Sequence, residues 1–206
     1  MSRLELVARH AAGRSFADIG AMWKVHGEVA FAAEAAGATA VTALDVMAAT
    51  PEFEAEQARR GSVVRFVCGD LHDAAVLELV GRHDVVWCSG VLYHAPHPLL
   101  TLERLRSITG ETLMLGTATI PEIPGFPQAC LYLPGLSDAQ RGAFTGAWPG
   151  VPMGVATPFR PEEGYANWWW AITPSALDAM LRTTGLEPVD TLRHPFSPAV
   201  IATVRR

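Results

Sequence analysis

The feature that most constrains the fold is an alternation of short strand-like runs with helical patterns. The apolar, β-rich runs lie at Ser15–Gly20, Ala40–Asp45, Val63–Cys68, Asp84–Ser89 and Glu111–Ala118. Helical patterns fall between them at Glu28–Ala36, Pro51–Arg60, Asp73–Val80 and Pro98–Ser107. This alternation is typical of βαβ units that build a parallel sheet. It predicts an α/β fold in which helices cover both faces of the sheet.

One more helix and two strands close the chain. Thr173-Pro174-Ser175 is an N-cap followed by proline in the first turn, and the helix that it opens stops at Gly185. Strands are expected at Leu186–Leu192 and Ala199–Val204, joined by a short turn that contains proline. We therefore expect seven strands in all, with a closing hairpin.

Residues 119–164 differ from the rest of the chain. Eight prolines and seven glycines interrupt any helical or strand period there. Long irregular segments inside compact domains are usually lids or binding loops, and the apolar content of this one argues against a loose surface excursion. We expect a single domain, 1–206, with 119–164 as a lid-like insertion after the fifth strand.

Composition limits the partners and the compartment. The formal charge of −5 disfavours nucleic acid, and no apolar run is long enough for a signal peptide or a membrane span. The three cysteines are odd in number and lack the spacing of a disulfide framework or a zinc site. We expect a cytoplasmic protein with no metal, and the oligomeric state stays open.

Lysine is almost missing from the chain. Fifteen of the sixteen basic residues are arginine, and the one lysine is Lys24, which is followed by Val25. A Walker loop needs Gly-Lys-Ser/Thr, and a pyridoxal Schiff base would have to use Lys24 itself. Both classes of enzyme are therefore disfavoured.

Acidic and small residues follow successive strands. Asp18-Ile19-Gly20 lies in the first strand, Asp45 ends the second, Gly69-Asp70 follows the third, and Ser89 to His94 follow the fourth. Ligands of open α/β sheets bind beyond the carboxyl ends of the strands. An acid after the second strand can accept hydrogen bonds from ribose hydroxyls, and one after the third can accept from an adenine amino group. The order predicts an adenosine site.

These motifs resemble those of the Rossmann-fold, class I S-adenosylmethionine-dependent methyltransferases. Within them, Asp18-Ile19-Gly20-Ala21, Gly90-Val91-Leu92-Tyr93-His94 and Asn167-Trp168-Trp169-Trp170 are similar to the branch that holds the tRNA wobble-uridine carboxymethyltransferases. The resemblance implies a three-layer fold with a mostly parallel seven-stranded sheet and an antiparallel last strand. It implies S-adenosylmethionine as the cofactor, with contacts at Asp18, Gly20, Ala21, Gly27, Asp45, Val46, Asp70, Leu71, Ser89, Gly90 and Leu92.

The loop after the first strand departs from the family pattern. A compact glycine-rich turn is usual there, whereas here Ala21 to His26 intervene before Gly27. Either Gly27 is a displaced loop glycine, or the methionine end of the cofactor is held differently. Lys24 in this loop can recognise an anionic acceptor or the cofactor's carboxylate.

His94 lies where the family brings the methyl group to the acceptor. A histidine is suited to take a proton from a hydroxyl acceptor, which makes His94 the candidate catalytic base. The alternative is that His94 caps a helix or packs beneath the cofactor. The remaining acceptor contacts are expected at Lys24, Tyr93, His97 and Trp168.

The leading hypothesis is an O-methyltransferase of a small metabolite or natural product. A tRNA wobble-uridine methyltransferase is the runner-up, although the acidic charge disfavours an RNA substrate. A nicotinamide dehydrogenase would need a G-x-G-x-x-G motif, which does not follow the first strand. A nonenzymatic cofactor-binding module stays open because of the altered loop.

Overall fold

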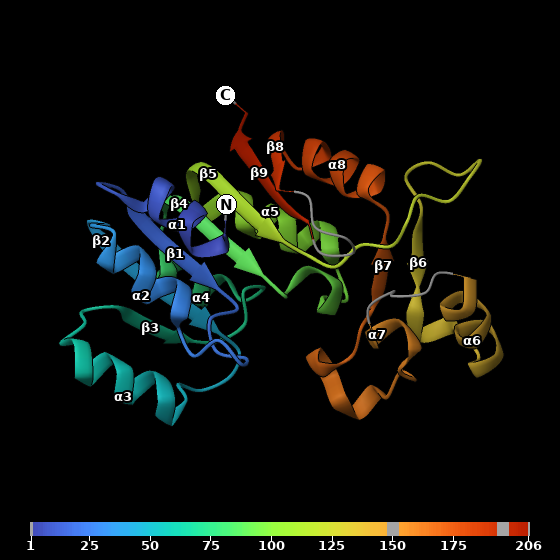
Figure 1. Cartoon of the computed structure of the whole chain (residues 1–206), viewed down its shortest axis with the longest axis horizontal. Coiled ribbons are helices and arrows are strands. Elements are labelled where there is room, and N and C mark those ends of the chain that lie inside the picture. The colour runs from blue at the N-terminus through green and yellow to red at the C-terminus, as the bar shows by residue number, and fades with distance from the viewer. Residues whose placement is uncertain (1, 148–152, 193–197, 206) are drawn as a thin grey trace.

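The computed structural model describes residues 2–147, 153–192 and 198–205. A first helix precedes an alternation of strands and helices that fills the N-terminal half of the chain (Figure 1). The elements of this half are α1 (Arg3–Ala11), β1 (Ser15–Ile19), α2 (Glu28–Ala35), β2 (Ala40–Asp45), α3 (Pro51–Arg60), β3 (Arg65–Cys68), α4 (Ala74–Val80), β4 (His83–Ser89), a 3-10 turn η1 (Leu92–His94), α5 (Pro98–Ile108) and β5 (Thr109–Gly116). Every strand and helix expected in this half is present, within two residues of the expected bounds.

The C-terminal half contains more short elements. They are β6 (Cys130–Tyr132), η2 (Leu133–Gly135), α6 (Asp138–Ala147), α7 (Met153–Ala156), η3 (Pro161–Ala166), β7 (Trp170–Ile172), α8 (Pro174–Thr183), β8 (Leu186–Leu192) and β9 (Ala199–Val204). The expected helix and the two closing strands are α8, β8 and β9. The turn expected between β8 and β9 lies outside the described residues.

The main sheet has seven strands in the order β3-β2-β1-β4-β5-β9-β8. Neighbouring strands pair in parallel from β3 through β5, and β9 pairs antiparallel with both β5 and β8. The mostly parallel seven-stranded sheet with an antiparallel last strand is thus confirmed. Because β1 and β4 are adjacent and their chain connections leave in opposite directions, the carboxyl ends of β1 and β4 mark a switch point where such sheets bind ligands.

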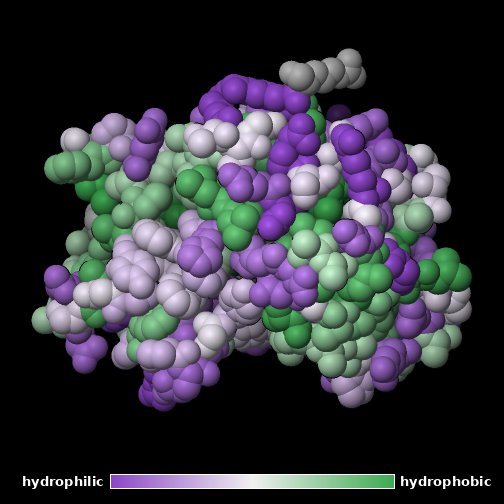
Figure 2. Space-filling model, turned by 180° about the vertical axis from the view of Figure 1, so that it is seen from behind, coloured by the Kyte–Doolittle hydropathy of each residue, from purple (hydrophilic) through white to green (hydrophobic). Residues whose placement is uncertain are grey.

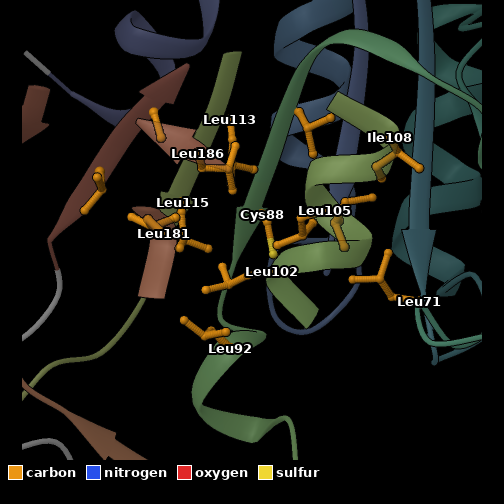
Figure 3. Close-up of a cluster of buried hydrophobic side chains, with 14 of the residues drawn as sticks. Leu71, Cys88, Leu92, Leu102, Leu105, Ile108, Leu113, Leu115, Leu181 and Leu186 are labelled. Atoms are coloured by element: carbon orange, nitrogen blue, oxygen red, sulfur yellow. The ribbon is translucent and has the colours of Figure 1, made fainter. Parts of the chain in front are cut away.

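Alternate residues of each strand enter two different cores. Ala17, Val86 and Leu113 belong to one cluster with α4, α5 and α8, whereas Phe16, Val85 and Met114 belong to another with α1, α2 and α3. Successive side chains of a strand point to opposite faces, so helices cover both faces of the sheet. Figure 3 shows part of the first cluster, in which side chains from β4, α5, β5 and α8 meet.

Local capping signals explain where several helices begin. The Thr50 hydroxyl accepts a hydrogen bond from the amide of Phe53, and Pro51 occupies the first turn of α3. Thr173 caps α8 in the same way through the amide of Ala176. Asp73 is the N-cap of α4 and lies just before the helix.

The segment 119–164 is less irregular than expected. It contains β6, α6 and α7, and β6 pairs antiparallel with β7, which lies beyond residue 164. A separate cluster of Ile120, Leu133, Val155 and Ala171 forms its core. Three-residue strands and a glycine-containing helix give weak periodicity, which explains why the sequence pattern missed them. Figure 1 shows β6, β7, α6 and α7 gathered beside the main sheet.

A buried arginine fixes this segment. Arg141 of α6 is 4% exposed, and its guanidinium donates hydrogen bonds to the carbonyl oxygens of Leu133, Val155 and Thr157. A buried cation is costly unless its donors are satisfied, so these three carbonyls hold the chain around Arg141.

Within the described ranges, no helix combines the length and the apolar character needed to cross a membrane. Hydrophilic and hydrophobic residues are interspersed over the face shown in Figure 2.

Candidate functional site

A cleft of about 590 Å³ lies at the carboxyl ends of β1, β2, β3 and β4. Helix α1, the β1–α2 loop and residues 165–168, which directly follow the insertion, contribute lining residues as well. Twelve of the site residues expected from the sequence line this cleft: Asp18, Gly20, Lys24, Asp45, Val46, Asp70, Leu71, Ser89, Gly90, Tyr93, His94 and Trp168. The structure therefore brings together the strand-end acids and the residues after β4.

Four expected site residues do not line the cleft in the described part of the chain. Ala21 and Leu92 are fully buried, and Leu92 packs into the core beside Leu102 (Figure 3). His97 is exposed and stands at the N-cap of α5, where its side chain forms no capping hydrogen bond. Geometry thus argues against direct cofactor contact for Ala21 and Leu92, and His97 does not line the cleft.

Gly27 is the fourth of these residues. It caps α2 with a φ of +77°, and a Cβ atom built on it would meet the ring of Phe53 at 2.4 Å. Its lack of a side chain is required by the close packing against Phe53 and by the left-handed backbone. Gly27 therefore serves the packing between α2 and α3, and the interpretation as a displaced cofactor-loop glycine is not supported.

Gly20 is the glycine at the cleft. Its φ is +82°, and a Cβ atom there would approach the Ser89 carbonyl oxygen to 2.9 Å. A side chain at Gly20 would clash at the junction of β1 and β4, so the backbone itself borders the cleft here. This close approach fits an extended ligand that crosses the sheet edge at the switch point.

Asp45 is held in a fixed position at the end of β2. Its Oδ2 accepts a hydrogen bond of 2.7 Å from the Met22 amide, and Oδ1 accepts one of 2.9 Å from the Met47 amide. A carboxylate has about four lone-pair positions, so two remain for a ligand. The hydrogen bond from Met22 attaches the β1–α2 loop to β2.

Asp18 has a different role in the site. It is 2% exposed, and its Oδ2 accepts a hydrogen bond of 3.1 Å from the Ala30 amide in α2. Burial raises the pKa of Asp18 to about 7, against the opposing effects of the Ala30 amide and of the Arg3 charge. Asp18 therefore fixes α2 against β1 next to the cleft.

Asp70 connects the cleft to the turn that directly follows the insertion. The hydroxyl of Tyr165 in η3 donates a hydrogen bond of 2.6 Å to Asp70 Oδ2, although 95 residues separate the two. The Tyr165 hydroxyl is also 3.2 Å from His72 Nδ1, and His72 Nε2 is 2.8 Å from the Thr101 hydroxyl. Burial and the hydrogen bond to Asp70 raise the pKa of Tyr165, so the phenol stays protonated.

His94 has a defined tautomer. Its Nδ1 lies 2.8 Å from the carbonyl oxygen of Asn167, which can only accept, so Nδ1 carries the proton. Burial lowers the pKa of His94, and this effect outweighs the Asn167 carbonyl, which raises it. The neutral ring therefore keeps a lone pair on Nε2, which is the form that a general base needs.

Asn167 also organises the chain around η3. Its Oδ1 accepts from the Arg160 amide, and its Nδ2 donates to the carbonyl oxygens of Arg160 and Gly164. The turn that carries Tyr165 and the carbonyl that orients His94 are thus held by one buried side chain.

The three tryptophans after Asn167 have separate environments. Trp168 packs on Tyr93 with 4.1 Å between the ring centroids and lines the cleft. Trp169 packs edge-on against Phe159, and the Trp170 indole donates to the Pro96 carbonyl. Of the three, only Trp168 lines the cleft.

Several lining residues were missed by the sequence reasoning, among them Arg3, Trp23, His72 and Tyr165. Trp23 is next to Lys24 in the unusual loop, and this position was a usable signal. Tyr165 had none, because its partner Asp70 is distant in the chain. Among the described residues, no group of three or more His, Cys, Asp or Glu side chains could hold a metal ion.

Residues 23–109 match the model of a methyltransferase domain family. No curated protein matches the chain.

Solved structures share the fold. The chain is similar to magnesium protoporphyrin IX methyltransferase from Synechocystis PCC 6803 with bound S-adenosylhomocysteine, at 17% identity and a TM-score of 0.59, over 98% of this chain and 82% of that chain. It is similar to a putative methyltransferase from Bacillus halodurans C-125 at 20% identity and a TM-score of 0.62, over 93% of this chain and 71% of that chain. It is also similar to mitomycin 7-O-methyltransferase at 15% identity and a TM-score of 0.61, over 98% of this chain and 53% of that chain. The expected Rossmann-like fold is thereby confirmed.

Proposed function

We propose that this S-adenosylmethionine-dependent methyltransferase acts on a hydroxyl group of a small molecule. The observation that carries the proposal is the tautomer of His94, whose Nδ1 proton is held by the Asn167 carbonyl and whose Nε2 is left as a base in the wall of the cleft. An oxygen acceptor has a proton to lose, and a positioned base assists that loss.

The cleft fits the cofactor. Asp45 keeps lone pairs for ribose hydroxyls, Asp70 keeps lone pairs for an adenine amino group, and Gly20 leaves the backbone open at the switch point. We assign Asp18, Val46, Leu71, Ser89 and Gly90 to the walls around them. When bound, the cofactor supplies an electrophilic methyl group attached to sulfur.

The residues of the chain orient the acceptor, exclude water and take the proton. Tyr93 and Trp168 form an apolar wall beside His94, which orients the acceptor and excludes water. The acceptor hydroxyl would then lie within reach of His94 Nε2, which would take its proton. The Asn167 carbonyl stabilises the imidazolium that results, because the Nδ1 proton remains hydrogen-bonded to it.

Size supports a small acceptor. A cleft of about 590 Å³ is in the range of small-molecule sites and has to hold the cofactor together with the reacting part of the acceptor. The net charge of −5 does not favour RNA, although the tRNA wobble-uridine branch remains a hypothesis that needs a direct test. We propose that 119–164 acts as a lid on a single domain.

The test is a methyl-transfer assay with labelled S-adenosylmethionine. Phenolic and alcoholic small molecules, amines and bulk tRNA are offered in separate reactions, and the products are analysed by mass spectrometry. We expect the label on a hydroxyl oxygen of a small molecule. Label only on amines, or only on tRNA, would overturn the proposal, and binding of cofactor without transfer to any class would leave a cofactor-binding module.

A further inference from the structure

We propose that the β1–α2 loop binds the acceptor, and that Trp23 and Lys24 select a planar aromatic acceptor that carries a carboxylate. The inference rests on the proposed function and names the class of acceptor for the same cleft. It assigns to the loop a role in substrate choice in place of the cofactor contact usual for such loops.

Trp23 is placed as an acceptor wall. Its side chain is 51% exposed and lines the cleft, and its ring stacks on His94 with 6.0 Å between centroids and 27° between planes. A large exposed aromatic ring beside the candidate base offers a flat apolar surface that a planar ligand can cover. An acceptor lying on Trp23 presents its hydroxyl to the neighbouring His94.

Lys24 supplies the charge. Its Nζ lies 5.7 Å from the centre of the Trp23 ring, and it also lines the cleft. Among the ion pairs of the described residues, none includes Lys24, whereas Arg3 in the same cleft is paired with Glu28. A cation that has no carboxylate partner, next to an exposed aromatic ring, is suited to an aromatic acid.

The loop is held so that these two side chains face the cleft. Lys24 and His26 both have positive φ, +58° and +45°, a conformation that costs free energy for residues with a side chain. Three contacts hold the loop. The Met22 amide donates to Asp45, the Gly27 amide donates to the Ala21 carbonyl, and His26 Nδ1 lies at hydrogen-bond distance from the Thr50 hydroxyl. The strained turn is therefore fixed at both ends.

The carboxylate could come from the acceptor or from the methionine end of the cofactor. Arg3 is the lining cation whose charge reaches Asp18 at the end of β1, where it lowers the pKa of that carboxyl. Arg3, which is also paired with Glu28, is thus the lining cation near the β1 end of the cleft, and Lys24, next to Trp23, is the cation that we assign to the acceptor. The experiment separates the two sources.

The test measures binding by calorimetry to protein saturated with S-adenosylhomocysteine. The probes are 4-hydroxybenzoate, phenol, which lacks the carboxylate, and 4-hydroxycyclohexanecarboxylate, which lacks the flat ring. We expect 4-hydroxybenzoate to bind at least about threefold more tightly than either comparator. Equal affinities for all three, or no binding of 4-hydroxybenzoate at millimolar concentration, would overturn the proposal.

Variants assign the two contacts. Lys24→Met should reduce the affinity for 4-hydroxybenzoate to that for phenol, and Trp23→Leu should weaken both aromatic probes while sparing the cyclohexane acid. Arg60→Met is the matched control, because Arg60 lies over the Phe31 ring and does not line the cleft. Unchanged binding of 4-hydroxybenzoate by Trp23→Leu or by Lys24→Met contradicts the assignment.

A second arm tests the cofactor as the source of the carboxylate. S-adenosylhomocysteine has the amino-acid group, and 5′-methylthioadenosine lacks it. If Lys24→Met weakens the binding of S-adenosylhomocysteine and not that of 5′-methylthioadenosine, Lys24 binds the cofactor and the proposal is wrong. An unchanged ratio of the two affinities supports the proposal. These readouts need no turnover, so their failure is distinct from a failure of the methyl-transfer assay.

Discussion

The Nδ1–H group of His94 donates a hydrogen bond of 2.8 Å to the main-chain carbonyl of Asn167, across 73 residues of sequence. This hydrogen bond joins the end of β4 to the segment that follows the insertion. Because a main-chain carbonyl cannot donate, it selects one tautomer of the imidazole and leaves Nε2 without a proton. The orientation of the candidate base therefore depends on how the 160–167 turn is folded.

The pH dependence of methyl transfer should report His94. Burial lowers the pKa of His94 below 6.5, and the neutral ring is the active form, so kcat/KM should rise with pH through an inflection below 6.5 and be constant at neutral pH. His94→Gln should remove this inflection and lower kcat by about 10² to 10⁴. Rates measured from pH 5 to 8 with the cofactor saturating provide the check. Near-normal turnover by His94→Gln would exclude base catalysis, and near-normal turnover by His94→Ala as well would return His94 to a packing role.

Asp45→Ala should weaken cofactor binding at least about tenfold. The substitution removes a charge-assisted acceptor of ribose hydrogen bonds and also frees the amides of Met22 and Met47. Calorimetry with S-adenosylhomocysteine measures the loss. Asp84→Ala is the control, because Asp84 also binds backbone through the Ser15 amide but does not line the cleft. If the two variants are folded and bind equally well, Asp45 is not the ribose residue.

Tyr165→Phe should loosen the chain at the end of the proposed lid, because Tyr165 lies in η3 directly after residue 164. The variant loses the hydrogen bond to Asp70, and because Tyr165 is 36% exposed we expect a modest effect of about 1 kcal/mol, or about fivefold faster amide exchange in residues 160–168 without ligand. Tyr132→Phe is the comparison, since the Tyr132 side chain is 48% exposed. Exchange that is as slow in Tyr165→Phe as in the parent protein would show that this hydrogen bond does not hold the segment.

The lid proposal itself is tested by hydrogen exchange in the free and the fully liganded protein. Equal protection of 119–164 in both would show that the segment is permanent structure and not a lid.

Gly27→Ala should lower stability more than Gly61→Ala. Both glycines have positive φ, which costs a residue with a side chain about 1–2 kcal/mol, but only at Gly27 would the new methyl group meet a ring, that of Phe53. Overpacking of that kind adds about 1–3 kcal/mol. Thermal unfolding compares the two variants. Cofactor affinity of folded Gly27→Ala should be unchanged, and a selective loss of affinity would restore Gly27 to the cofactor site.

The sequence predicted the parallel half of the fold well because its signals are local. Strand runs end in Asp45 or precede Asp70, and helix starts are marked by Thr50 and Thr173, all within a few residues of what they control. The strand-end rule of α/β sheets then placed most of the candidate cleft without any distance information.

The rest depended on contacts between distant residues. In the sequence Gly27 could be interpreted as a displaced loop glycine, and only the position of Phe53 shows that the glycine serves packing. The contact of Tyr165 with Asp70 requires the course of the insertion, which short strands and glycine-containing helices conceal. Leu92 was expected to contact ligand because of its place in a motif, yet its side chain points into the core.

The pairing of β6 with β7 has a consequence for how this chain tolerates change. Because Tyr132 pairs with Trp170, the stretch between them is a closed loop whose two ends are pinned to each other. Lengthening a loop with fixed ends adds only about 0.6 kcal/mol per doubling of its length, so material can be added or removed around α6 and α7 without moving the seven-stranded sheet. Such exchange would leave the strand ends that form the cleft in place, provided that the turn holding Tyr165 and Asn167 is kept.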